Sequence, residues 1–254
     1  INNRENPWKT HKRLMDFSKR HREDELMDDQ SVSTDKLKLI YDDINRANSF
    51  LGGTNQLLHA VARLIAKNPK QKYSLIDVGC GDGKMLQNIC LFFRSKNLKV
   101  SLIGIDINEN AIALAETSSK DFPEITYLKA DILQEDYGLS KVDFVVSTLT
   151  MHHIPEESIP DFLTQLGRMA HIGIVINDLQ RSRLAYTLFK FFSAIFIKTK
   201  EAKNDGLVSI RSGFTKKELL QYSIGLPQYH HTIKWKWAFR YVWALHIKRP
   251  MKNE

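Results

Sequence analysis

The sequence is poor in cysteine and contains no long apolar run. Its two cysteines, Cys80 and Cys90, suggest neither a disulfide framework nor a zinc site, by number or by spacing. No stretch has the length and apolarity of a membrane span, and no signal-peptide pattern stands at the start. Hydrophobic residues make up 43% of the 254 positions and charged residues 26%, as in soluble proteins. We therefore expect a cytoplasmic protein with one sizeable domain and an appendage.

Two common nucleotide-binding motifs are also missing. No G-x-x-x-x-G-K-[ST] string occurs, which excludes a P-loop. The glycine series Gly79, Gly81, Gly83 has Lys84 where a G-x-G-x-x-G dinucleotide fingerprint needs its third glycine. The series nevertheless follows an apolar run that ends at Ile76 and precedes an apolar helical pattern. Such a strand–glycine turn–helix unit binds nucleotide-like ligands in open α/β sheets, because glycines let a ligand approach the backbone closely.

Acidic residues follow three successive predicted strands. Asp77 comes at the end of the first strand, just before the glycine turn. Asp106 ends the second strand, residues 100–105, about 20 residues past the turn, where a carboxylate accepts from both ribose hydroxyls of a nucleotide. Asp131 follows the third strand, residues 125–128. Together these three carboxylates are stronger evidence for a nucleoside site than the glycines alone.

The rest of the chain continues the alternation of strands and helices. Further strands are predicted at residues 142–147 and 172–176, and a closing pair near 228–235 and 237–246. Thr215 opens a capping box at the start of the helix before the closing pair. Strands that alternate with helices at this pitch predict a mostly parallel sheet.

The glycine turn and the three acidic residues resemble the cofactor site of class I S-adenosylmethionine (SAM) dependent methyltransferases. The resemblance implies a Rossmann-like, doubly wound α/β fold, with a seven-stranded mostly parallel sheet and an N-terminal helical cap. It implies that Asp131 accepts from the adenine amino group, that Ile132 packs on the ring, and that the helix after Gly83 meets the methionine carboxylate. The cofactor-binding residues implied by the resemblance are Asp77, Gly79, Cys80, Gly81, Gly83, Asp106, Ile107, Asp131, Ile132 and Ser147.

Three segments resemble a narrower branch, the bacterial small-molecule methyltransferases of quinol or polyketide type. These segments are residues 147–154, 177–186 and 209–215, and the resemblance covers residues 36 to 240. It implies SAM-dependent O-methylation of a small, apolar, aromatic acceptor such as a phenol, a quinol or a polyketide.

His152 and His153 lie where the fourth strand of this branch opens onto the substrate. An imidazole there can serve as the base that makes a phenolate near neutral pH; the alternative is a structural role in anchoring the loop. A metal-dependent, catechol-type mechanism needs acidic ligands at the ends of the fourth and fifth strands. Asp178 could serve at the fifth, but Ser147 and Thr148 supply no carboxylate at the fourth, so we predict no metal.

The chain divides into residues 1–70, a helical arm and a cap or lid, and residues 71–254, the SAM-binding domain with a helical insertion near 184–213. The insertion begins with residues 184–197, which are apolar on nearly all sides and too short to span a bilayer. This segment walls a pocket, contacts another subunit or a membrane surface, or packs in the core. Three residues of the turn inside the cap either face the pocket or only cover the sheet: Asn48, Phe50 and Leu51.

The net charge of +8 comes from the C-terminal quarter. Residues 190–254 carry 13 basic and 4 acidic side chains, against 24 and 25 in residues 1–189. Such a region suits an anionic substrate, a carrier protein, an anionic membrane or RNA, or is a solvated basic face. The alternative functions are an RNA or protein methyltransferase and a non-catalytic SAM-binding protein. No nucleic-acid module and no N/D-P-P-Y/F/W tetrad is present, so we expect a small-molecule acceptor and no specific nucleic acid, and we leave membrane or carrier contact and the oligomeric state open.

The cofactor assignment predicts the effect of replacing Asp106. Calorimetric titration with SAM and its demethylated product is expected to show micromolar binding to the wild type and none to Asp106→Ala, because the ribose-binding carboxylate is removed. A wild-type protein that binds neither compound would contradict the assignment. The glycine turn would then be structural or would serve another nucleotide.

Overall fold

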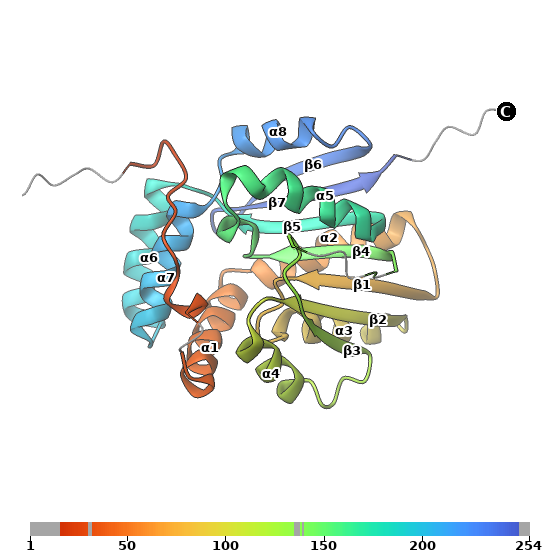
Figure 1. Cartoon of the computed structure of the whole chain (residues 1–254), viewed down its shortest axis with the longest axis horizontal. Coiled ribbons are helices and arrows are strands. Elements are labelled where there is room, and N and C mark those ends of the chain that lie inside the picture. The colour runs from red at the N-terminus through yellow and green to blue at the C-terminus, as the bar shows by residue number, and fades with distance from the viewer. Residues whose placement is uncertain (1–15, 30–31, 135–137, 139, 249–254) are drawn as a thin grey trace, which may run out of the picture.

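The computed structural model describes residues 16–29, 32–134, 138 and 140–248, and its centre is one seven-stranded sheet (Figure 1). The strands are β1 (Lys72–Val78), β2 (Lys99–Asp106), β3 (Ile125–Lys129), β4 (Val142–Thr148), β5 (Ala170–Leu179), β6 (Tyr229–Lys236) and β7 (Arg240–Ile247). They lie in the order β3-β2-β1-β4-β5-β7-β6; β7 is antiparallel to β5 and β6, and all other pairs are parallel. The predicted doubly wound, mostly parallel α/β sheet is confirmed.

The fifth strand is longer than the sequence predicted. It continues to Leu179, because Asn177, Asp178 and Leu179 pair with Val242, Tyr241 and Arg240 of β7 in an antiparallel ladder. Two polar side chains expected just after this strand therefore lie within it, and both are buried. The ladder fixes their positions relative to β4 and β7.

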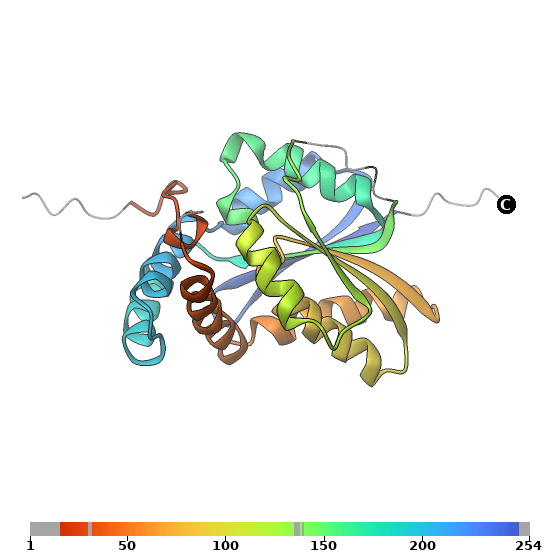
Figure 2. The same ribbon diagram turned by 60° about the horizontal axis from the view of Figure 1, so that its bottom comes forward.

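Helices cover both faces of the sheet. One apolar cluster joins the sheet to α2 (Gly53–Lys67), α3 (Lys84–Ser95) and α4 (Glu109–Ser118). A second cluster, on the opposite face, includes side chains of α5 (Ile159–Met169) and α8 (Lys216–Ile224), and the views in Figures 1 and 2 show these two helices together. The capping box predicted at Thr215 is present. Because α2 belongs to the sheet layer, only α1 and the arm before it remain as an N-terminal cap.

Three helices gather beyond one end of the sheet: α1 (Thr34–Phe50), α6 (Arg183–Phe196) and α7 (Lys200–Ser212) (Figures 1 and 2). A buried carboxylate ties them together. Asp43 of α1 accepts from the backbone amides of Lys198 and Thr199, at 2.9 and 2.7 Å, where the chain passes from α6 to α7. None of the helices in these described ranges is long and apolar enough to cross a membrane.

Residues 16–29 run across this helical cap as an arm, whose one regular element is a 3-10 turn, Leu26–Asp28. Asp205 of α7 accepts from the amides of Leu26 and Met27 at 2.9 and 3.0 Å. The arm at the start of the predicted cap, residues 1–70, is thus mainly irregular before α1 where it is described, and residues 1–15, 30 and 31 lie outside the described part.

The close packing of β5 predicts that Gly173→Ala is destabilising. A Cβ atom at Gly173 would lie 2.6 Å from the carbonyl oxygen of Leu245 and 3.3 Å from the methyl groups of Leu64. We expect a loss of about 1–3 kcal/mol in unfolding free energy, measured by thermal unfolding. Gly225→Ala is the control, because its φ of −69° and nearest contact of 3.5 Å accept a methyl group. Equal midpoints for the two variants would contradict this account.

Candidate active site

A cavity of about 1870 Å³ lies between the carboxyl ends of the strands and the helical cap. Single-ligand pockets span roughly 300–1,000 Å³, so this cavity has room for two ligands side by side. Its wall at the ends of β1, β2 and β3 includes eight of the ten predicted cofactor residues: Asp77, Gly79, Cys80, Gly81, Asp106, Ile107, Asp131 and Ile132.

The glycine turn is shaped so that backbone, not side chain, forms the cavity floor. Gly79 and Gly81 have φ of 75° and 54°, a region that favours glycine. A Cβ atom at Gly79 would lie 2.2 Å from Thr150 Oγ1, and one at Gly81 would lie 2.8 Å from the ring of Tyr41. The amides of Gly79 and Cys80 donate to the carbonyl of Ile105, which fixes the turn against β2.

Asp106 is held in place by the same turn. Its Oδ2 accepts from the Gly81 amide at 2.8 Å, and its Oδ1 accepts from the Asn108 amide at 2.9 Å. A carboxylate has about four lone-pair sites, so each oxygen keeps one for a ribose hydroxyl. Asp77 Oδ1 is buried without a partner, and burial together with the nearby charge of Asp106 raises the pKa of Asp77 well above its usual range. These carboxylates, with apolar Ile107 beside them, fit the hydroxyl, ammonium and adenine groups of SAM.

Two residues implied by the resemblance do not line the cavity. Gly83 lies behind the cavity wall. It is the N-cap of α3 with a φ of 78°, and a Cβ atom there would lie 2.2 Å from the hydroxyl of Tyr127. Ser147 is buried and its hydroxyl has no partner. Because successive side chains of a strand point to opposite faces, its neighbour Thr148 reaches the cavity instead.

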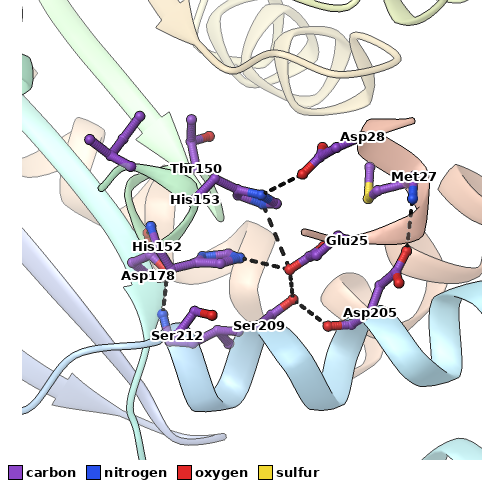
Figure 3. A network of polar contacts seen from close by, with 12 residues as sticks. Glu25, Met27, Asp28, Thr150, His152, His153, Asp178, Asp205, Ser209 and Ser212 are labelled. Atoms are coloured by element: carbon purple, nitrogen blue, oxygen red, sulfur yellow. Dashed lines mark hydrogen bonds and ion pairs between the residues drawn. The ribbon is translucent and has the colours of Figure 1, made fainter. Parts of the chain in front are cut away.

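His152 is clamped between two carboxylates (Figure 3). Its Nδ1 lies 2.6 Å from Asp178 Oδ1, and its backbone amide donates to Asp178 Oδ2 at 3.1 Å. Its Nε2 lies 3.5 Å from Glu25 Oε1. Burial by itself would lower the pKa of His152, but the two carboxylates outweigh it and raise the pKa to about 10. His152 is therefore an imidazolium at neutral pH and holds the arm against β5.

His153 stacks beside it, with ring centroids 4.3 Å apart, and also lines the cavity. Its Nδ1 lies 3.0 Å from Asp28 Oδ2, and its Nε2 lies 3.9 Å from Glu25 Oε1. Burial and the charge of His152 lower the pKa of His153, but Glu25 and Asp28 outweigh them and the pKa is raised.

Glu25 was missed by the sequence analysis. It accepts from the Ser209 hydroxyl and is 6% exposed, yet it lies in a charged stretch that resembles a solvated arm. With His152 and His153 it forms a group whose ligand atoms lie within 4.8 Å of one another (Figure 3). Glu25 lies outside the ends of β4 and β5, where metal ligands were considered, so a metal-free site stays a prediction.

The opposite wall of the cavity is apolar. It includes Leu188, Phe189 and Phe192 of α6, together with Trp237 before β7. One side of residues 184–197 thus walls the pocket, while Phe191 and Ile195 on another side are exposed, so contact with another subunit or a membrane surface stays a prediction. The three residues of the cap turn also face the cavity: Asn48, Phe50 and Leu51.

The comparison with protein families agrees with this geometry. Residues 75–173, from the glycine-turn strand to the middle of β5, match the profile of a family described as a methyltransferase domain. Residues 75–173 of this chain are a methyltransferase domain. The recognition made from the glycine turn and the acidic strand ends is confirmed, and SAM is the cofactor of that family.

Curated relatives of the domain include uncharacterised methyltransferases from Mycobacterium bovis and Mycobacterium tuberculosis. Each is 29% identical to this chain over 119 residues. The match covers 47% of this chain and 56% of the length of each relative.

Solved structures share the fold of the methyltransferase domain and of its cap. The plantazolicin methyltransferase BpumL, in complex with SAH, is 18% identical with a TM-score of 0.66, and the match covers 88% of this chain and 94% of that one. The magnesium protoporphyrin IX methyltransferase of Synechocystis PCC 6803, also with SAH, is 15% identical with a TM-score of 0.54, over 78% and 84% of the two chains. At these identities the likeness shows the fold.

The clamp on His152 predicts a pH-dependent stability. Between pH 6.5 and 10 the folded protein keeps a proton on His152 that the unfolded chain releases, so this stabilisation is complete below pH 6.5 and is lost as the pH rises to 10. Each pKa unit corresponds to about 1.4 kcal/mol, so urea unfolding of the wild type should lose a few kcal/mol across this window. His152→Gln should lose much less, whereas His171→Gln, at an exposed position, should follow the wild type. Parallel curves for wild type and His152→Gln would show that His152 is not charged.

Proposed function

We propose that this protein transfers a methyl group from SAM to an oxygen of a small, apolar, aromatic acceptor of phenol, quinol or polyketide type. The observation that carries the proposal is the two-sided cavity. Carboxylates and a glycine turn form one side, and aromatic and aliphatic side chains of the cap form the other. A single cavity with these two walls brings a nucleoside cofactor and an apolar acceptor together.

The cap supports a small acceptor. Helices α1, α6 and α7 and the arm cover the carboxyl end of the sheet (Figure 2), and buried hydrogen bonds at Asp43 and Asp205 hold them there. A folded RNA or protein cannot reach the strand ends past this cover without opening it. The similar solved structures are consistent with this range of acceptors, because they are a plantazolicin methyltransferase, a magnesium protoporphyrin IX methyltransferase and a domain of the citrinin polyketide synthase.

The residues of this chain have two tasks in the transfer. When bound, the cofactor supplies a methyl group activated on a sulfonium. Asp106 and Asp131 hold the nucleoside, while the apolar wall orients the acceptor and excludes water. Orientation of this kind contributes several kcal/mol, and up to roughly 7–11 in ideal cases.

His153 is the residue that takes the acceptor proton. Both histidines line the cavity, but His152 is buried and protonated between Asp178 and Glu25, whereas the side chain of His153 is 27% exposed. When Nδ1–H of His153 donates to Asp28, Nε2 carries the lone pair that accepts the phenol proton. The phenolate oxygen would then be the nucleophile for the methyl group that bound SAM would supply, and His153 would keep the phenol proton.

The proposed function is tested with SAM carrying a radiolabelled methyl group and a panel of phenols and quinols. Label is expected in the organic extract and not in added RNA or protein. Tight SAM binding with no labelled product across the panel would favour the non-catalytic alternative, and label in RNA or protein would favour the macromolecular one.

Replacing His153 separates its role from cofactor binding. His153→Ala is expected to lower kcat by about 10²–10⁴-fold, the usual contribution of a general base, with the Kd for SAM unchanged. The loss should shrink for nitro-substituted phenols, which are already ionised at neutral pH. An equal loss on every phenol would assign His153 a purely structural role.

A further inference from the structure

One buried cation in the cavity has no partner. Arg240, the first residue of β7, is 4% exposed, and its Nε and Nη1 make no hydrogen bond. Burial lowers the pKa of Arg240 to about 10, partly offset by the charge of Asp178, so the guanidinium is charged at neutral pH. Asp178 does not neutralise it by contact, because that carboxylate is hydrogen-bonded to His152. A buried charge without a partner is costly, which points to a ligand that supplies one.

Among the residues that the structure describes, no carboxylate forms an ion pair with Arg240. Asn48 and Asn177 are buried and each has an Oδ1 without a partner; Asn177 donates to the carbonyl of Gly53 at 3.0 Å. A Cβ atom at Gly53 would lie 2.9 Å from Arg240 Nη1 and 2.0 Å from Asn48 Oδ1, so both side chains lie against the start of α2. Neutral amides leave the charge of the guanidinium uncompensated.

The start of α2 adds a second source of positive potential. Its N-cap, Gly52, has no side chain to satisfy the first-turn amides, and both Thr54 and Asn55 line the cavity. A helix N-terminus of this kind favours an anion. Arg240 and this helix end therefore face the same part of the cavity.

The location separates this group from the cofactor. Arg240 pairs with Leu179 of β5, and β1, β4 and β5 all lie between β7 and Asp106 of β2. The neighbouring cavity wall is apolar and includes Trp237 and Phe239. An anion bound here is part of the acceptor, not of SAM.

We propose that Arg240 and the N-terminus of α2 bind a carboxylate carried by the acceptor. The inference rests on the proposed function, since it specifies the acceptor of that same cavity: an aromatic carboxylate whose apolar part lies against the cap. The anchor sets the register of the acceptor, and the methylated oxygen lies toward β4 and His153. Arg240 is thus a specificity-determining residue.

The test is calorimetric titration of the full chain, saturated with SAH, with 2-naphthoate and its neutral analogue 2-naphthamide. Naphthoate is expected to bind at least ten-fold more tightly than naphthamide. Arg240→Met should reduce naphthoate to the affinity of naphthamide and leave naphthamide itself within two-fold. Lys38→Met, which removes an exposed positive charge that also lines the cavity, should preserve the difference.

The outcomes distinguish this proposal from the one on which it rests. Failure of the wild type to bind SAH contradicts the proposed function. SAH binding with equal affinities for naphthoate and naphthamide overturns the carboxylate site alone, and tighter binding of 2-naphthyl phosphate than of naphthoate overturns the choice of carboxylate. If Arg240→Met does not fold, Arg240→Lys is used in its place. The site would also be overturned if Arg240→Lys kept the full ten-fold preference for naphthoate and if added acetate did not reduce that preference.

Discussion

The site depends on one topological constraint: the parallel strands all end at the same edge of the sheet. The chain winds from β1 outward to β3, then returns to place β4 on the other side of β1. Connections on the two sides of this point diverge, so a crevice opens between them. Asp77, Asp106 and Asp131 are far apart in sequence, and they meet because each follows or ends a strand on that edge. Cofactor and acceptor sides of the cavity are both consequences of this arrangement.

A buried electrostatic clamp turns that open edge into a closed cavity. The Asp178–His152–Glu25 series links β5 to the arm through an imidazolium. Its ions are removed from water, which is costly unless each is paired. The clamp therefore specifies one position of the arm, and breaking any member leaves an uncompensated charge. His153 follows His152 in the chain, so the same contacts fix its position at the acceptor side of the cavity.

Local sequence patterns were sufficient to predict the strands, the capping box at Thr215 and most residues of the cavity wall at the ends of β1, β2 and β3, because each of these features depends on a few neighbouring residues. They were insufficient where a distant strand or helix decides. The extension of β5 through Asp178 comes from pairing with β7. Ser147 was predicted to contact the cofactor, but the neighbouring side chain reaches the cavity instead. Alternation along the strand, and not position in a motif, decides which face a side chain lies on. Glu25 gave no local signal.

By itself the sequence determined the fold class, the family and the cofactor, since a glycine turn and acidic strand ends work through backbone geometry and local register. Only the tertiary structure decided the roles of the polar side chains. The two adjacent histidines are alike in sequence, yet paired carboxylates make His152 a buried, fixed cation, whereas the side chain of His153 stays partly exposed. Likewise Arg240 is one of many basic residues in the C-terminal quarter, and burial without a counter-ion is what distinguishes it. Charge state and pairing depend on what the fold brings together, which no local pattern records.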